Sequence, residues 1–404
     1  MKLWSRVTLA AVGFALISLS GLRLLGQAPE QGKAAAKGKA APAPAKAAEP
    51  AVRGVVLAPA GKSAGEVFKN VNTSTLKVLT VDDFLGAMGV LSAALGLDCA
   101  DCHPGAGSDK VDWVFDTPRK KMARRMVEMV ATINRTNFGG AQSVTCWSCH
   151  HGRLRPATTI GLDTLYSSPN EEKDDIVATG QGVPTATQIL DKYIVAVGGV
   201  QRLAGLTSFI ATGSSIGYEG LGGGGSFTIY AKAPNQRTTQ IQFKDHPERG
   251  DSTRTFDGEI GWVKSPRSLL GQFELTGSER DGVRLDAMMS FPGQIKTILT
   301  NWRVGAPDTI GDKDVYVVQG SGLRGFLATL YFDKNTGLLL RVVRYSTSPI
   351  GRVPTQTDYS DYRDVGGIKF PFKYTFSWLD GRDSFQLSDV KTNVAIDPSK
   401  FAKP

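Results

Sequence analysis

All four cysteines of the chain lie in two copies of one short pattern, a Cys-x-x-Cys pair followed directly by histidine. The copies are "CADCH" at residues 99–103 and "CWSCH" at residues 146–150. Thiols at this spacing can attach a haem through two thioether bonds, supply half of a zinc site, or form a redox dithiol. The pattern limits the chemistry of these residues to those three alternatives, and the chain outside the motifs must decide among them.

Haem attachment accounts for every position of both motifs. Two thiols on one side of a short helical turn can each add to one vinyl group, and the adjacent histidine then supplies the proximal iron ligand. Zinc sites usually separate their ligand pairs by about 12–20 residues, whereas 43 residues lie between Cys102 and Cys146, and no βαβ context for a redox dithiol surrounds the two motifs. We therefore predict two covalently attached c-type haems. The predicted attachment residues and proximal iron ligands are Cys99, Cys102 and His103 for one haem and Cys146, Cys149 and His150 for the other.

The N-terminus indicates export. A short basic start precedes sixteen uncharged residues, 7–22, which is typical of a secretory signal or a short signal-anchor. We predict a signal peptide or signal-anchor over residues 1–28, cleaved or retained as an inner-membrane anchor, and a disordered Ala/Lys/Pro tether over residues 29–63. Residues 1–70 hold ten Lys and Arg against three Asp and Glu, so +7 of the net charge of +9 lies there. We expect a periplasmic protein without a nucleic-acid partner.

A methionine-bearing amphipathic helix is expected before the first motif. Residues 81–95 place Met88 in an apolar stripe, with Thr80 suited to cap the helix and Gly96 suited to end it. Methionine is a common distal ligand of c-type haem iron. A methionine in an apolar stripe is equally consistent with ordinary core packing, so the pattern alone leaves both interpretations of Met88 open.

The second motif is preceded by a helix of the same kind. Thr117 can cap it, Pro118 suits its first position, and its apolar face holds Met122, Met126 and Met129. Spacing by itself does not choose among these three methionines as a distal ligand. The recurrence of helix, loop and motif indicates an internal repeat of one haem-binding unit.

Residues 65–159 resemble the cytochrome c subunit family of photosynthetic reaction centres. The resemblance lies in "FKNVNTSTLKVLTVDDFLGAMGVLSAALGLDCADCH" and in "ARRMVEMVATINRTNFGG" with "VTCWSCHHG". In that family a methionine from the helix before each motif is the distal ligand, so the resemblance implies Met88 for the first haem and Met126 for the second. The family has four such units, a frequent lipid-bearing cysteine, and commonly an arginine where this chain has His151. We therefore transfer the haem chemistry and not the photosynthetic partner.

The chain beyond Leu206 changes from helical to alternating apolar periodicity. Residues 166–184 are polar and broken by Pro and Gly, which predicts a linker, and residues 185–404 open with a capped helix followed by many strands. Hairpin turns are expected at 257–258 and 335–337, with a helical interruption around residues 280–302.

These segments predict a multidomain fold. A mostly α dihaem cytochrome domain over residues 64–165 would precede an α+β domain with a curved antiparallel sheet. The second domain resembles the half-barrel fold of outer-membrane lipoprotein carriers, through its opening helix ending in Gly-Gly and through "DYRDVGGIKFPFKYTF".

The function expected from these features is electron transfer between periplasmic or membrane redox proteins, with the β domain docking a partner or contacting lipid. Two alternatives remain at this stage. One haem could have a labile sixth ligand and act as a peroxidase-like enzyme, or the β domain could bind lipid or lipoprotein while the haems sense redox state. The chain shows no other catalytic signature worth assigning. The tether or the β domain could touch a membrane surface.

Overall fold

The computed structural model describes residues 61–404 apart from 107, 109, 160–175, 217–223, 244–249, 266–270, 324–325 and 380. The predicted leader and nearly all of the predicted tether lie outside the described residues, as does the first part of the predicted linker. The described residues all belong to one compact unit, residues 51–404. Among the described helices, none is both long and apolar enough to span a bilayer.

The segment from residue 61 to residue 159 is helical. Its helices are α1 (Ala64–Val67), α2 (Val81–Leu95), α3 (Cys99–Cys102), α4 (Pro118–Asn137) and α5 (Cys146–His150). Both helices expected before the motifs are confirmed with their ends. Thr80 Oγ1 accepts a hydrogen bond from the Asp83 backbone N–H, and Gly96 adopts the left-handed conformation that ends α2. Thr117 caps α4 in the same way.

The predicted apolar face of α4 coincides only in part with the face that the helix buries. Val127, Val130 and Asn134 are buried, whereas the side chains of Met122 and Met129 are 52% and 42% exposed. The polar Asn134 helps to set this orientation, because its amide bonds the loop before the second motif. Asn134 Nδ2 donates to the Val144 carbonyl at 2.8 Å, and Asn134 Oδ1 accepts from the Val144 N–H at 2.9 Å. Apolar periodicity alone could not show this polar anchor.

The rest of the described chain forms one antiparallel sheet with a few helices. After α7 (Ala186–Val197) and α8 (Val200–Ala204), the strands follow in the order β6-β5-β4-β3-β2-β1-β14-β13-β12-β11-β10-β9-β7, with β8 paired to β9. The strands are β1 Ser208–Ser215, β2 Ser226–Lys232, β3 Gln236–Gln242, β4 Ser252–Phe256, β5 Gly261–Lys264, β6 Gln272–Leu275, β7 Thr300–Val304, β8 Asp308–Ile310, β9 Lys313–Ser321, β10 Leu327–Asp333, β11 Leu339–Ser348, β12 Gly351–Val365, β13 Ile368–Trp378 and β14 Gly381–Thr392. The turns expected at 257–258 and 335–337 lie between paired strands, as predicted.

The predicted helix over residues 280–302 is wrong at its C-terminal end. Helix α9 covers Gly277–Met289, a 3-10 turn follows at Pro292–Gln294, and β7 begins at Thr300. Proline interrupts helical hydrogen bonding, and the polar and β-branched residues of β7 pair with β9. Pairing with β9 therefore outweighs the helical periodicity of residues 300–302.

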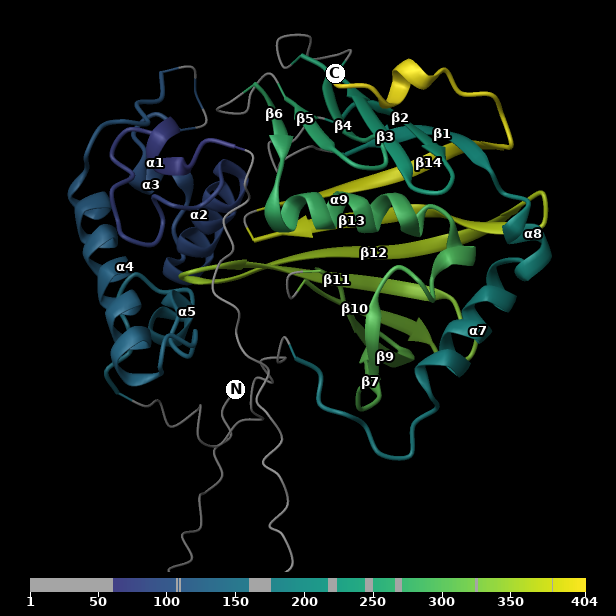
Figure 1. The fold of residues 1–404 in the computed structure, drawn as a ribbon, viewed down its shortest axis with the longest axis horizontal. Helices are drawn as coiled ribbons and strands as arrows, with labels where there is room; N and C mark the ends of the chain where they lie inside the picture. The colour runs from purple at the N-terminus through teal and green to yellow at the C-terminus, as the bar shows by residue number, and fades with distance from the viewer. Residues whose placement is uncertain are drawn as a thin grey trace, which may run out of the picture. The chain divides into compact units, whose positions relative to one another are not determined.

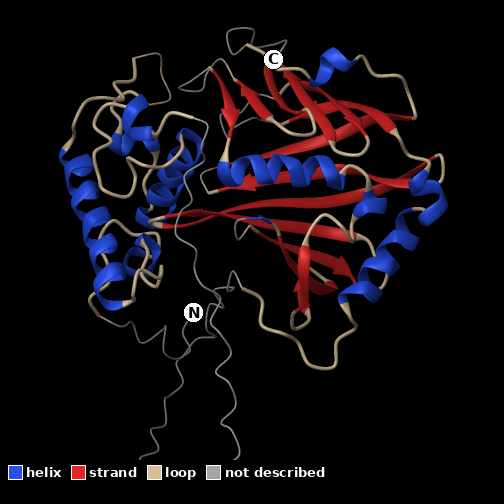
Figure 2. Cartoon of the chain, viewed as in Figure 1, coloured by secondary structure: helices blue, strands red, loops and turns tan. Residues whose placement is uncertain are grey.

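The sheet curves around α9. This helix contacts β3, β4 and β5 and also β11, although β4 and β11 are seven places apart in the strand order. Seven strand spacings in a flat sheet span roughly 34 Å, while a helix is only about 10 Å wide. One helix can touch both strands only if the sheet folds back over it. Figures 1 and 2 show α9 lying within the hollow of the sheet.

The hairpin between β11 and β12 enters the core of the helical segment. Ile350, at its tip, is 1% exposed and belongs to a cluster with Leu79, Ala87 and Val90. The Ile350 carbonyl accepts a hydrogen bond from the backbone N–H of Cys146 at 3.1 Å. A residue of the sheet therefore supports the start of the second motif.

Candidate haem sites and the adjoining cavity

The first motif lies on a single capped turn of helix. Asp98 Oδ1 accepts from the Asp101 N–H at 3.0 Å and Asp101 Oδ2 accepts from the Asp98 N–H at 3.1 Å, which makes a reciprocal capping box. The His103 N–H closes the turn onto the Cys99 carbonyl at 2.8 Å. One such turn spaces Cys99 and Cys102 along a single side of the helix.

His103 follows this turn and is held neutral. Burial, and then the positive charge of Lys120, lower the pKa of its imidazole to about 4. Its buried Nδ1 has no hydrogen-bond partner among the described residues, and the ring of Trp113 lies 5.0 Å away between centroids. A neutral imidazole with an unsatisfied nitrogen suits a metal ligand.

The second motif is built in the same way. Thr145 caps α5 through a box with Ser148. His150 Nδ1 lies 3.0 Å from the Arg153 carbonyl oxygen, and because a carbonyl can only accept, Nδ1 is the donor. That tautomer leaves the lone pair of Nε2 available to a metal, as in many metal-binding histidines. Cys149 is exposed, while Cys146 is buried and burial raises the pKa of its thiol to about 11.

Each motif is supported by the helix that precedes the other motif. Thr117 Oγ1, at the start of α4, donates to the Cys102 carbonyl at 3.3 Å. At the end of α2, the Ala94 carbonyl accepts from the Gly152 N–H at 2.9 Å. A Cβ on Gly96 would meet the Gly152 carbonyl oxygen at 2.2 Å, so this close approach requires glycine. The two predicted haem units are therefore interlocked.

The predicted distal ligands differ in their surroundings. Met88 is half-buried and borders the same cavity as Cys99 of the first motif. On α4, Met126 is half-buried between the exposed Met122 and Met129. The assignments of Met88 and Met126 to iron stay predictions, as do those of the motif cysteines and histidines.

The surface around the motifs suits two porphyrins. Several large apolar side chains of this segment are exposed to solvent. They are Trp113, Val114, Phe115, Met122, Met129, Phe138, Trp147 and Leu154. A porphyrin is a large flat apolar group that would cover such side chains. Within the described ranges, no three His, Cys, Asp or Glu side chains gather as a metal-ion site. The exposed apolar side chains beside the two motifs fit a haem.

The concave face of the sheet encloses a cavity of about 580 Å³. Its lining comes from most of the strands, from α9 and from the side of α2 that carries Met88. A volume of this size is typical of sites that bury a small organic ligand. Of the two methionines at 288 and 289, Met289 is in the lining.

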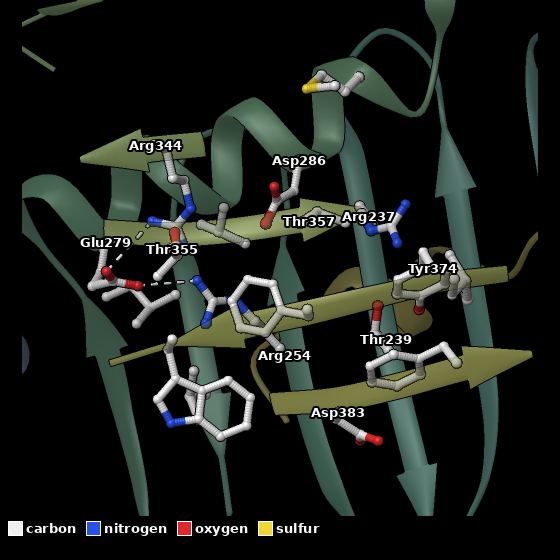
Figure 3. A pocket seen from close by; sticks show the side chains of 18 of the residues that line it. Arg237, Thr239, Arg254, Glu279, Asp286, Arg344, Thr355, Thr357, Tyr374 and Asp383 are labelled. Atoms are coloured by element: carbon white, nitrogen blue, oxygen red, sulfur yellow. Dashed lines mark hydrogen bonds and ion pairs between the residues drawn. The ribbon is translucent and has the colours of Figure 1, made fainter. Parts of the chain in front are cut away.

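A partly buried ion cluster lines this cavity (Figure 3). Glu279 of α9 pairs with Arg254 of β4 at 3.2 Å and with Arg344 of β11 at 3.4 Å. Burial alone would raise the pKa of Glu279, but the charges of Arg344 and Arg254 outweigh it and lower the pKa to about 2. The carboxylate of Glu279 thus joins β4 and β11, which belong to the two arms of the curved sheet.

Sequence reasoning did not find this cluster. Arg254, Glu279 and Arg344 lie in three different elements and share no local motif. The only signal in the sequence is that Arg344 occupies a strand whose neighbours are largely apolar, "LLLRVVRY". A charged residue in such a strand requires a buried partner.

Comparison with protein families supports the haem interpretation in part. Residues 20–190 match the model of the photosynthetic reaction centre cytochrome C subunit family, a match that includes both motifs and covers less than half of the chain. The resemblance stated for residues 65–159 is confirmed, and a cytochrome role for this segment is supported. No curated protein matches the chain.

Similar solved structures exist for the part of the chain that holds the sheet. A DUF1329 family protein from Desulfovibrio piger is 14% identical with a TM-score of 0.38, over 55% of this chain and 98% of that one. A LolA superfamily protein from Nitrosomonas europaea is 15% identical with a TM-score of 0.37, over 55% and 99%. A putative outer membrane lipoprotein-sorting protein domain from Vibrio parahaemolyticus is 11% identical with a TM-score of 0.36, over 53% and 97%. The half-barrel itself follows from the strand order and from the contacts of α9.

Proposed function

We propose that this chain is a dihaem c-type cytochrome that transfers electrons between redox partners in the periplasm. The observation that carries the proposal is the pair of capped CxxCH turns, each with a histidine nitrogen left for iron, inside the segment that matches the reaction centre cytochrome family. Bound haem would supply one-electron exchange at iron. The partners proposed are periplasmic or membrane redox proteins.

The residues of this chain would have distinct roles. The capped turns hold the two thiols of each motif on one side, where thioether bonds form. His150 Nδ1 is fixed by the Arg153 carbonyl, which would leave Nε2 of the ring to bind iron. The sulfur of Met88, and that of Met126, would complete the two iron sites and raise their potentials relative to histidine.

The experiment is to express the chain in a host that matures c-type cytochromes and to measure its mass and its reduced pyridine spectrum. Two tetrapyrrole increments and two haems per chain are expected. In Met88→Ala and Met126→Ala, the methionine–iron absorption at the red end of the spectrum should be lost from one haem each. Met122→Ala is the matched control on α4 and should change neither spectrum nor potential. A colourless protein, or equal spectra in all variants, would contradict the proposal.

A second function is favoured by the cavity inside the sheet. Its 580 Å³ and its largely apolar strands could hold part of a lipid or a lipid-modified protein. In this alternative the haems would report redox state to a carrier domain. Extraction of the purified protein with organic solvent, followed by mass spectrometry, tests it: a stoichiometric acyl lipid would support the alternative.

A further inference from the structure

The cavity of the sheet reaches the helix that carries Met88. Asp82, in the first turn of α2, accepts hydrogen bonds from the backbone N–H and from Oγ1 of Thr276, each at 2.7 Å. Thr276 precedes α9, and Glu279 of the ion cluster follows three residues later. Met88 is six residues after Asp82, roughly 9 Å further along the helix axis at 1.5 Å per residue. A ligand at the ion cluster would thus lie close to the predicted first haem.

The charges in the cavity lining are nearly balanced. The acidic side chains are Asp82, Asp83, Glu279, Asp286 and Asp383, and the basic ones are Arg237, Arg254, Arg344 and Lys369. Five negative and four positive charges leave a net charge of −1. An anionic head group, such as a fatty-acid carboxylate or a phosphate, gains little from such a lining. A neutral head group with hydrogen-bonding atoms fits it better.

The polar groups of the cavity include both donors and acceptors. Arg344, whose side chain is 4% exposed, fixes Glu279, and Glu279 in turn holds Arg254, whose side chain stays 32% exposed and lines the cavity. Arg237 is held by Ser290 Oγ at 2.7 Å. Figure 3 shows the carboxylate of Asp286 between the guanidinium groups of Arg237 and Arg344. A head group that accepts hydrogen bonds in one state and donates them in another would find partners in both states.

The remaining lining combines hydroxyl-bearing side chains with a group of large apolar ones. It includes Phe209, Ile229, Ile241, Phe370, Phe385 and Leu387. These side chains come from β1, β2, β3, β13 and β14, which lie in the middle of the sheet. A ligand that fills the cavity would thus combine a polar head group with an apolar tail.

We propose that this cavity binds a quinone and its quinol, with the ring at Arg254, Arg237 and Asp286 and the isoprenoid tail along the apolar strands. The inference rests on the proposed electron-transfer function, because the bound quinol would be the electron donor. Oxidation of one quinol breaks two O–H bonds, forms two C=O bonds and releases two electrons and two protons. Two haems would accept these two electrons, one each, and the carboxylate of Asp286 in the lining would accept a proton as it is released.

The test is equilibrium dialysis of the full haem-loaded chain against decylubiquinone, with bound quinone measured by its own absorbance after extraction. We expect about one quinone per chain. Arg254→Gln should weaken binding about tenfold, the size expected when a charged hydrogen bond is lost. Thr357→Phe replaces a small lining side chain of β12 with a large one and should abolish binding, which covers the case in which Arg254→Gln is poorly folded. Arg341→Gln removes an ion pair with Asp358 on β11 and β12, outside the cavity lining, and is the matched control.

The outcomes separate this inference from the proposed function. Haem content is measured on every sample, so a haem-loaded chain that binds no decylubiquinone overturns the inference and leaves the electron-transfer proposal standing. Quinone binding by a chain without haem would support the site and overturn the proposed function. Palmitate bound in place of decylubiquinone, or equal quinone binding by all variants, also overturns the inference.

Discussion

The helical segment and the sheet differ in the size of their hydrophobic cores. The core of the helical segment has eight buried residues, one of which, Ile350, comes from the sheet. The main core of the sheet is much larger and draws on strands throughout its length and on α7 and α9. A core as small as the first cannot by itself repay the ordering of about one hundred residues. We therefore expect the helical segment to depend on the sheet and on its predicted haems, whereas the sheet has its own core.

The largest expected effect comes from removing one haem. In the double variant Cys99→Ala/Cys102→Ala, one tetrapyrrole increment should be lost from the mass and about half of the haem absorbance should disappear. The helical segment should then unfold at a lower temperature, because the apolar side chains around the motif would be exposed to water. The far-UV circular dichroism of the sheet should stay unchanged. Cys146→Ala/Cys149→Ala is the reciprocal control. Full haem content in either variant would contradict covalent attachment.

The next effect concerns the hairpin tip that joins the two regions. Ile350→Ala should lower the free energy of unfolding by about 3 kcal/mol, since a fully buried isoleucine leaves a cavity. Denaturant unfolding followed by haem absorbance should shift to a lower denaturant concentration, whereas unfolding followed by far-UV circular dichroism should shift less, because the sheet has its own core.

The matched control for this variant is Leu323→Ala. Leu323 lies between β9 and β10 and is 60% exposed, so its truncation should change stability by less than about 0.5 kcal/mol. Equal shifts of the haem absorbance and circular dichroism transitions in Ile350→Ala would show instead that the two regions unfold as one unit.

The third effect concerns the ion cluster of the sheet and the dependence of stability on pH. The pKa of Glu279 is lowered from 4.5 to about 2, so its ionised form stabilises the fold above pH 4.5 and this contribution is lost as pH falls toward 2. The contribution is about 3 kcal/mol. Glu279→Gln should lower stability at pH 7 and flatten the loss of stability between pH 4.5 and pH 2.

Asp361→Asn is the control for this pH experiment, because it removes an exposed pair with Arg363. Its acid unfolding curve should stay close to that of the unmodified chain. If Glu279→Gln keeps the original acid dependence, the cluster does not hold the arms of the sheet together.

The smallest effect is expected at the first motif. Arg119 pairs with Asp101 at 2.5 Å, but the Arg119 side chain is 44% exposed and the Asp101 side chain is 34% exposed. Exposed ion pairs contribute less than about 1 kcal/mol. Arg119→Gln should keep both haems and shift thermal unfolding only slightly. Loss of the first haem in this variant would show that Arg119 acts on the cofactor rather than on the surface.

Local chemistry could be predicted from the sequence to a useful extent. The capped helices before the motifs, with Thr80 and Gly96 at the ends of α2, were confirmed because caps act over three or four residues. The hairpin turns were confirmed for the same reason. The alternation of residues also predicted a curved antiparallel sheet, which the strand order and the contacts of α9 support.

Other features depended on residues far apart in the chain. No pattern in the sequence indicated that Ile350 would complete the core around the second motif, or that α4 would bury Asn134 in preference to Met122 and Met129. The helix expected over residues 280–302 failed where β7 found its partner in β9.

The sequence by itself therefore determined the two motifs, their capped turns and the period of the strands, because each depends on neighbours within a few residues. Only the tertiary structure decided that Arg254, Glu279 and Arg344 meet and that Met88 borders the same cavity. The physical reason is that burial creates the need for a charged partner, and a curved sheet brings that partner from a distant strand.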